Sequence, residues 1–212
     1  MDIQIKIRAI CIVIGYACGN FLTAEVVTRH MTGRPCSELG TSGNPGMTNV
    51  LRHLGLKAGI VVLAGDILKT IIAMYTCFML FGRMLGRIAI FYGGFGAILG
   101  HDFPIWQHFR GGKGVACCCT MLFLYSPWGF VAILIALASI LATDYLCIGG
   151  AVTPAAFIVP AFLFHGLETG VLTVLLSVIF FLKHWSSIKL IPSGQCEKIN
   201  VIGMLRNSFG QE

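Results

Sequence analysis

Seven apolar blocks separated by short polar segments constrain this chain more than any other feature of its sequence. Hydrophobic residues make up 56% of its 212 residues and charged residues only 11%, which leaves too little polar surface for a water-soluble protein of this length. A helix that crosses a bilayer needs about 20 apolar residues, or fewer where the bilayer thins, so the blocks predict transmembrane helices. The predicted spans are 7–28, 55–81, 85–100, 115–125, 128–142, 150–164 and 169–182.

The predicted fold class is all-α, a polytopic integral membrane protein with seven transmembrane helices. Ser126 and Pro127 divide what would otherwise be one long span, because proline removes a helix donor and clashes with the preceding turn. A five-helix alternative fuses the fourth block with the fifth and the sixth with the seventh. No internal repeat, low-complexity tract or soluble domain is evident, so residues 1–212 are expected to form a single domain.

Seven spans would place four connections on one face of the membrane: the loop after the first span, residues 100–114, residues 143–147 and the tail from Lys183. Most of the cations fall on this face, and four others, Lys6, Arg8, Arg83 and Arg87, do not. The positive-inside rule therefore predicts that this face is cytoplasmic, in the plasma membrane of the cell. The cations on this face are Arg29, Arg34, Arg52, Lys57, Arg110, Lys113, Lys183, Lys189, Lys198 and Arg206.

The first long loop, GTSGNPGMTNVLRHLG at residues 40–55, has the composition of an anion-binding loop. Glycine-rich turns before a helix present backbone N–H groups and a helix N-terminus, and both bind phosphate oxygens. The alternative is an ordinary connection between helices. The predicted phosphate-binding residues are Ser42, Gly43, Asn44, Gly46, Thr48 and Asn49, with Arg52 as a cation.

A second candidate, HFRGGKGVA at residues 108–116, places glycines around a lysine between two apolar blocks. Gly111, Gly112 and Gly114 allow backbone and ammonium to approach one ligand, and Lys113 supplies a compact positive charge. The sequence is not a nucleotide P-loop, because that motif requires a further glycine and a hydroxyl residue at positions that this chain fills differently. The alternative is a glycine hinge with a lysine that extends to the interface.

Three polar side chains near the predicted spans need separate interpretation. His184, after the last span, is predicted to join the site, although a lone histidine at a membrane edge is commonly an interfacial residue. Asp66 and Lys69 lie three positions apart in the second span, so they share a helix side and are expected to pair with each other; a polar cavity is the alternative. The cysteines lack ligand-like spacing, so no metal site is expected.

Together these elements resemble the bacterial acyl-phosphate:glycerol-3-phosphate acyltransferases, the PlsY family of integral membrane enzymes. SGNPGMTNVLRHLG is similar to the first family motif, Ser-Gly-Asn-x-Gly-Ala-Thr-Asn with a following arginine. GHDFPIWQHFRGGKGVA is similar to the second, Gly-His-x-Phe-Pro followed by Gly-Gly-Lys-Gly-Val-Ala, and DILK at residues 66–69 fits a family feature of the second span. The resemblance implies seven spans and transfer of an acyl group from acyl phosphate to glycerol 3-phosphate, which gives lysophosphatidic acid and phosphate.

The chain departs from the family pattern in three places, and the first is Met47, which stands where the first motif has alanine. The third motif, His-Arg-x-Asn-Ile and later Gly-Thr-Glu, is replaced by HWSSI from His184 and by GQCE at residues 194–197. Where the family often has Thr-Arg-Tyr-x-Ser, residues 143–147 read TDYLC. These changes suggest a divergent member with altered substrate preference or reduced activity.

The expected function is that of an acyltransferase in phospholipid synthesis that works by positioning and electrostatic stabilisation, with Lys113, Arg52 and His184 as catalytic residues. The resemblance implies that neither a metal nor acyl-CoA is required, and no cofactor or nucleic acid is expected. The expected partners are the two substrates, the bilayer and a soluble enzyme that produces acyl phosphate. Two alternatives remain: a catalytically altered lipid-binding relative, and a small anion or lipid transporter.

Overall fold

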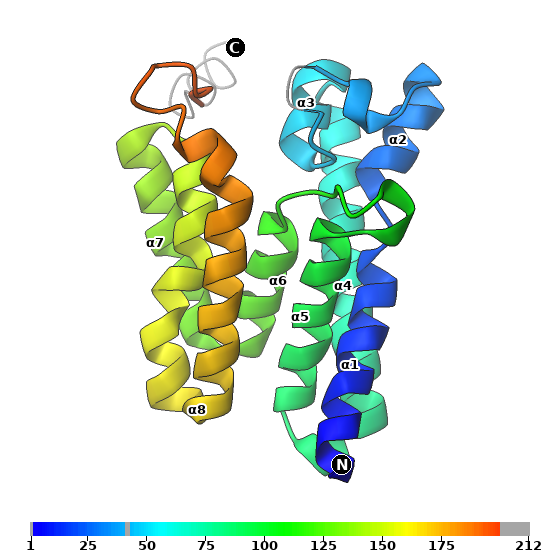
Figure 1. Ribbon diagram of the computed structural model, residues 1–212, viewed down its shortest axis with the longest axis vertical. Helices are drawn as coiled ribbons and strands as arrows, with labels where there is room; N and C mark the ends of the chain where they lie inside the picture. The colour runs from blue at the N-terminus through cyan, green and yellow to red at the C-terminus, as the bar shows by residue number, and fades with distance from the viewer. Residues whose placement is uncertain (1, 41–42, 200–212) are drawn as a thin grey trace, which may run out of the picture. The chain divides into compact units, whose positions relative to one another are not determined.

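In the computed structural model, residues 2–40 and 43–199 are described, and every regular element within them is helical. The chain divides into two compact units, Met1–Tyr125 (unit 1) and Ser126–Glu212 (unit 2). Unit 1 contains helices α1 to α6 and unit 2 contains α7 and α8 (Figure 1). The predicted all-α class is confirmed for the described ranges, and the single domain over 1–212 stays a prediction.

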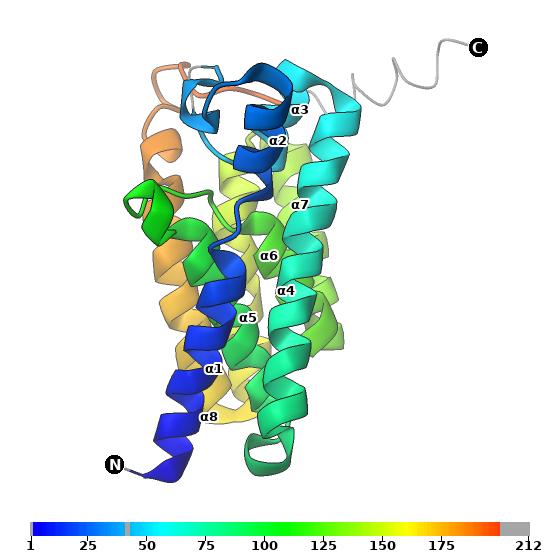
Figure 2. The same cartoon turned by 90° about the vertical axis from the view of Figure 1, so that its right-hand side faces the viewer.

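The core of unit 1 consists of α1, α4, α5 and α6, which pack against one another (Figures 1 and 2). Two short helices, α2 and α3, and two 3-10 turns, η1 and η2, lie in the connections. The bounds are α1 (Ile3–Gly19), α2 (Thr23–Thr32), η1 (Cys36–Glu38), α3 (Met47–Leu54), α4 (Leu56–Leu85), α5 (Ile88–Asp102), η2 (Ile105–Gln107) and α6 (Val115–Tyr125).

Glycines allow α1 and α5 to touch backbone to backbone. A methyl group at Gly96 would overlap the carbonyl of Ile12, and one at Gly100 would overlap that of Tyr16. Small residues permit this close approach in membrane helices, where no hydrophobic force drives one helix against another. Since position 12 faces 96 and position 16 faces 100, the two helices run parallel.

Helix α4 runs antiparallel to α5, because Lys69 contacts His101 near one end and Cys77 lies against Gly93 further along. The C-terminal ends of α1 and α5 and the N-terminal end of α4 therefore share one end of unit 1. The connections that leave these ends are residues 20–55 and 103–114. The fold thus brings both predicted phosphate-binding loops to the same end (Figures 1 and 2).

The predicted span over 7–28 lies within Ile3–Thr32, a stretch long and apolar enough to cross a membrane, and a helix break between α1 and α2 interrupts it. The Asn20 side-chain amide donates to the carbonyl of Tyr16 at 2.7 Å, and its Oδ1 accepts from the backbone N of Ile105 at 2.9 Å. A side chain that bonds the backbone in this way competes with helix continuation. The break places the carbonyl of Phe21 inside the unit, where Lys69 binds it.

Four helical stretches in the described ranges are long and apolar enough to cross a membrane: Ile3–Thr32, Leu56–Leu85, Ile88–Gln107 and Leu146–Ile188. Two shorter apolar helices, α6 and α7, have 11 and 17 residues. By length and composition, these helices are those of an integral membrane protein. The total of seven spans stays a prediction.

Unit 2 consists of α7 (Pro127–Thr143) and α8 (Leu146–Ile188), which pack against each other. Ser126 begins α7 by accepting the backbone N–H of Trp128, and Pro127 occupies the first turn, where no helix donor is lost. Gly166 interrupts α8 with φ 85° and ψ 177°. The interruption falls between the predicted blocks 150–164 and 169–182, so these two blocks are separate helical segments.

Candidate functional site

The first loop leads into the N-terminus of α3, a short helix inside the stretch that was predicted as a loop before the span at 55–81. Gly43 adopts φ 53°, and a methyl group there would overlap the carbonyl of Ser37. The Gly46 N–H donates to the carbonyl of Asn44 at 2.9 Å, and Gly46 is the extended residue that precedes α3. This backbone path requires glycine at position 43 and turns the chain into the first turn of a helix.

Some side chains of the first loop form hydrogen bonds that stabilise the conformation of the loop. Asn49, which is buried, donates from Nδ2 to the carbonyl of Leu39 at 2.9 Å, and its own carbonyl accepts from Nδ1 of His53 at 2.9 Å. Thr48 is half-buried in the first turn of α3, whereas Arg52 is exposed in its last turn. Ser42 lies outside the described residues, and so does Arg206 of the predicted cationic face.

The second loop is built directly on the end of α5. The backbone N of Gly111 donates to the carbonyl of Asp102 at 3.1 Å, and that of Gly112 donates to the carbonyl of His101 at 3.0 Å. A methyl group at Gly112 would overlap the imidazole Nε2 of His101. Gly112 is therefore glycine for a steric reason, since the ring occupies the place of a side chain.

The remaining residues of the second loop lead into α6. Lys113 is half-buried, and Gly114 adopts φ 63°, which favours glycine. The carbonyl of Gly114 accepts from the backbone N of Cys118 at 2.8 Å and so begins the hydrogen bonding of α6. Lys113 thus lies immediately before a helix N-terminus, where backbone N–H groups and the helix dipole favour an anion.

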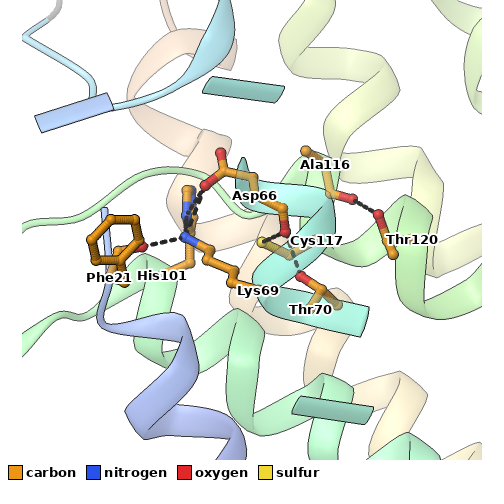
Figure 3. A network of polar contacts seen from close by, with 8 residues as sticks. All are labelled: Phe21, Asp66, Lys69, Thr70, His101, Ala116, Cys117 and Thr120. Carbon is orange, nitrogen blue, oxygen red and sulfur yellow. Dashed lines mark hydrogen bonds and ion pairs between the residues drawn. The ribbon is translucent and has the colours of Figure 1, made fainter. Parts of the chain in front are cut away.

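A buried polar network lies beneath the second loop (Figure 3). Nζ of Lys69 is 2.8 Å from Oδ1 of Asp66, 2.8 Å from Nδ1 of His101 and 2.8 Å from the carbonyl oxygen of Phe21. Asp66, Lys69 and His101 are 2%, 6% and 4% exposed. The predicted Asp66–Lys69 pair is confirmed. The network also contains His101 of the second motif and the carbonyl of Phe21, which lies at the break between α1 and α2.

The contacts of Lys69 determine which nitrogen of His101 carries the proton. A protonated lysine has three N–H donors and no acceptor, and the three groups around Nζ can each take one of them. With Lys69 protonated, Nδ1 of His101 accepts, which assigns the ring hydrogen to Nε2, the atom that faces Gly112. Oδ1 of Asp66 lies 3.6 Å from Nδ1 of His101, which is too long for a hydrogen bond. Lys69 therefore links the two side chains by contacting both.

The network extends to the neighbouring helices. The Asp66 carbonyl accepts from Oγ1 of Thr70 at 2.8 Å and from Sγ of Cys117 in α6 at 3.8 Å (Figure 3). The Tyr16 hydroxyl of α1 donates to the carbonyl of Phe103 at 2.6 Å. The start of the second loop is thus held by α1, and the network beneath the loop is joined to α6 through Cys117.

His184 belongs to unit 2 and lies near the end of α8. It is 2% exposed, so its ring lies inside unit 2 and not on the surface of that unit. The carbonyl of Phe180 lies 2.8 Å from Nδ1, which places a hydrogen there, and Nε2 lies against Gly150. The membership of His184 in the phosphate site stays a prediction.

The sequence predicted both loops but missed His101 as a functional residue. The signal was present: an aspartate and a lysine inside one apolar span require polar partners, and His101 stands at the end of the next span within the same motif as the glycines. Glu25 of α2, a further polar residue within the predicted first span, forms an ion pair with Arg29 and accepts the backbone N–H of Cys36 at 2.8 Å.

The chain is similar to glycerol-3-phosphate acyltransferases over most of its length. The family model of that description matches residues 9–194. Glycerol-3-phosphate acyltransferase 1 of Lactobacillus acidophilus is 35% identical over 205 residues, which cover 96% of this chain and 97% of that protein. The glycerol-3-phosphate acyltransferase of Bacillus subtilis is 33% identical over 184 residues, 86% of this chain and 93% of that protein.

Two solved structures share the fold. The crystal structure of PlsY, an integral membrane glycerol 3-phosphate acyltransferase, in its glycerol 3-phosphate form has a TM-score of 0.80 and 24% identity. The structural match covers 93% of this chain and 98% of the PlsY chain. The lysophosphatidic acid form of the same enzyme has a TM-score of 0.78.

Proposed function

The chain belongs to the glycerol-3-phosphate acyltransferase family, and from this membership we propose that it acylates glycerol 3-phosphate with acyl phosphate as the donor. The products are lysophosphatidic acid and inorganic phosphate, which makes the reaction a step of phospholipid synthesis. The observation that carries the proposal is the presence of two glycine-rich loops at one end of unit 1, because the reaction has to hold two phosphates near each other.

Each loop receives one phosphate in this proposal. The first loop, residues 42–49, holds one phosphate with its backbone amides and the first turn of α3, and Arg52 contributes a cation. Gly111, Gly112 and Gly114 with Lys113 hold the other phosphate or the charge that develops on it. His184 orients glycerol 3-phosphate.

The reaction requires the protein to position the two substrates more than to activate them. The first hydroxyl of glycerol 3-phosphate attacks the acyl carbonyl, the bond between the carbonyl carbon and the phosphate oxygen breaks, and phosphate leaves with the electron pair. Because phosphate is a good leaving group, the protein chiefly aligns the hydroxyl and stabilises the departing charge. The hydroxyl proton passes to a phosphate oxygen, so no side chain has to act as a general base.

The membrane arrangement in this proposal follows from the apolar helices. Seven spans place both loops at the cytoplasmic face of the plasma membrane, and the acyl chain enters sideways between the helices. A soluble enzyme that produces acyl phosphate docks on the cationic face. Cysteines introduced at Asn44 and Lys113 in a cysteine-free variant should react with an impermeant reagent only in opened cells. Labelling of either cysteine from outside would contradict this arrangement.

A purified-enzyme assay tests the proposed activity. The protein in detergent, given palmitoyl phosphate and labelled glycerol 3-phosphate, should form labelled lysophosphatidic acid. Lys113→Ala should lower kcat/KM by about 100-fold, the usual effect of removing one charge-stabilising donor. Lys57→Ala is the matched control, since Lys57 is an exposed lysine in the first turn of α4. No product from the unaltered protein would overturn the function, and an equal loss in both variants would overturn the assignment of Lys113.

The altered third motif favours one second candidate, a relative that binds the lipid product without turnover. Ser187 stands where the family pattern has asparagine, and Glu197 is displaced by one place from the glutamate of Gly-Thr-Glu. This candidate predicts saturable binding of lysophosphatidic acid together with no labelled product in the same assay. Product formation at a steady rate excludes it.

A further inference from the structure

We propose that His101 is a positioning residue that sets the conformation of the loop at residues 111–114. The inference rests on the proposed role of this loop in binding phosphate. His101 acts from beneath the loop: its carbonyl accepts the backbone N–H of Gly112, and its ring fills the space where a side chain at position 112 would stand. One residue thus fixes both the backbone and the packing of Gly112.

The ring of His101 is itself held in one orientation. Lys69 donates to Nδ1 at 2.8 Å, and Lys69 is in turn held by Asp66 and by the Phe21 carbonyl. Lys69 and Asp66 are almost fully buried, so moving either one without the other would leave a buried charge unpaired, which is strongly unfavourable. The ring therefore presents its Nε2 hydrogen to the loop with little freedom to rotate.

Two substitutions test the contributions of the two ring nitrogens of His101 separately. Asparagine places an acceptor near the position of Nδ1 and nothing at Nε2, whereas glutamine can place an N–H near the position of Nε2. If His101 positions the loop through Nε2, His101→Gln should keep kcat/KM within about threefold of the unaltered enzyme and His101→Asn should lose at least about tenfold. The loss should appear mainly in the KM of the substrate whose phosphate the loop holds.

The outcomes distinguish this inference from the proposed function. An unaltered enzyme that makes no lysophosphatidic acid overturns the function. If the unaltered enzyme is active and His101→Asn has the same kcat/KM as His101→Gln, only the role of His101 is overturned. In that case the ring would serve only as a hydrogen-bond acceptor for Lys69 at Nδ1. If neither variant folds, nitrogen chemical shifts of labelled histidines in the unaltered protein decide, and a hydrogen on Nδ1 of His101 overturns the proposal.

A different observation supports a second inference in unit 2. Sγ of Cys147, at the start of α8, lies 3.7 Å from Sγ of Cys196 in the tail that follows α8. Other contacts hold the tail there: the backbone N of Ile199 donates to the carbonyl of Asp144 at 2.8 Å, and Nζ of Lys198 lies 5.5 Å from the ring centre of Tyr145. The two thiols need to approach by only about 2 Å to reach bonding distance.

We infer that Cys147 and Cys196 form a disulfide when the protein meets a hydroperoxide. The half-buried Cys196 sulfur attacks the peroxide, the O–O bond breaks, and water leaves together with a sulfenic acid on Cys196. The sulfur of Cys147 then attacks that of Cys196, the S–O bond breaks and a second water leaves. Two thiols and one hydrogen peroxide thus give one disulfide and two waters.

The disulfide would restrain the surroundings of His184. Cys147 and Gly150 are three positions apart on α8, so they share a helix side, and Gly150 is the residue against which Nε2 of His184 lies. A bond at Cys147 would therefore fix the tail one helical turn from the His184 ring. Because cytosolic reductants keep most thiols reduced, the bond would be transient.

Peptide mapping after hydrogen peroxide treatment tests this inference. We expect a linked peptide that contains Cys147 and Cys196, a fall of at least about threefold in acyl transfer, and recovery with dithiothreitol. The Cys196→Thr variant should keep its activity through the same treatment, which separates this disulfide from oxidation of the other cysteines. Absence of the linked peptide, or an equal loss of activity in the Cys196→Thr variant, overturns the inference.

Discussion

Adding one methyl group at Gly112 should damage both packing and activity, and the structure gives the size of each effect. The methyl would overlap Nε2 of His101, a ring that cannot turn aside because Lys69 holds Nδ1 at 2.8 Å. Overpacking of this kind costs about 1–3 kcal/mol, or a fall in Tm of roughly 2–10 °C for a chain of this length. The loop, which is the softer partner, should move away from the ring.

The displaced loop should lower activity more than stability. A shift of about 1 Å in a substrate-positioning element can reduce kcat/KM by about 100-fold. We therefore expect Gly112→Ala to fold and to transfer the acyl group poorly. Thermal unfolding in detergent and the palmitoyl phosphate assay measure the two effects on the same preparation.

A double-mutant cycle with His101→Asn tests the steric explanation. Asparagine ends before the position of Nε2, so the methyl at position 112 should fit, and the Tm of the double variant should match that of His101→Asn alone. This corresponds to a coupling energy of at least about 1 kcal/mol between the two positions. Additive losses in Tm would refute the reasoning, since they would show that the methyl meets something other than the ring.

Three further predictions concern other parts of unit 1. Lys69→Met should lower the free energy of unfolding by about 3–5 kcal/mol, because it leaves the Asp66 carboxylate buried without its cation. Adding Asp66→Asn should recover part of this loss, as measured by thermal unfolding. Gly96→Leu should lower the Tm, because its side chain would push the Ile12 backbone and separate α5 from α1; an unchanged Tm would contradict the backbone contact. Burial raises the pKa of the Cys36 thiol, so less thiolate forms at pH 8, and alkylation should be slower in the folded protein than in denaturant; equal rates would contradict it.

Hydropathy predicted the bounds of a helix best where residues that stop a helix stand at both ends of the apolar block. The span predicted over 115–125 coincides with α6, which Gly114 precedes with a positive φ and which Ser126 and Pro127 follow. The first span was predicted without its break, since one asparagine hardly changes the mean hydropathy of a long apolar window. The break depends on Ile105 and Lys69, which bind Asn20 and Phe21 from distant parts of the chain.

The site was predictable to the extent that its residues are local in sequence. Glycines around Lys113 and the glycine-rich loop before α3 indicate anion binding from composition alone. The contribution of His101 was not predictable in this way, because it depends on the antiparallel packing of α4 against α5 that brings Lys69 to Nδ1. Spacing along one helix predicted the partner of Asp66, but it could not predict a partner on another helix.

The Asp66–Lys69 pair is better explained by what Lys69 connects than by the stability of the pair. A buried ion pair can often be replaced by apolar residues without loss of stability, so attraction alone gives no reason for two charges inside a span. Lys69, however, binds a carbonyl at the break between α1 and α2 and also fixes the ring beneath Gly112. Replacement of both charges by apolar residues should therefore recover part of the Tm lost on removing Lys69 alone without restoring kcat/KM, because neither the carbonyl nor the ring would regain its partner.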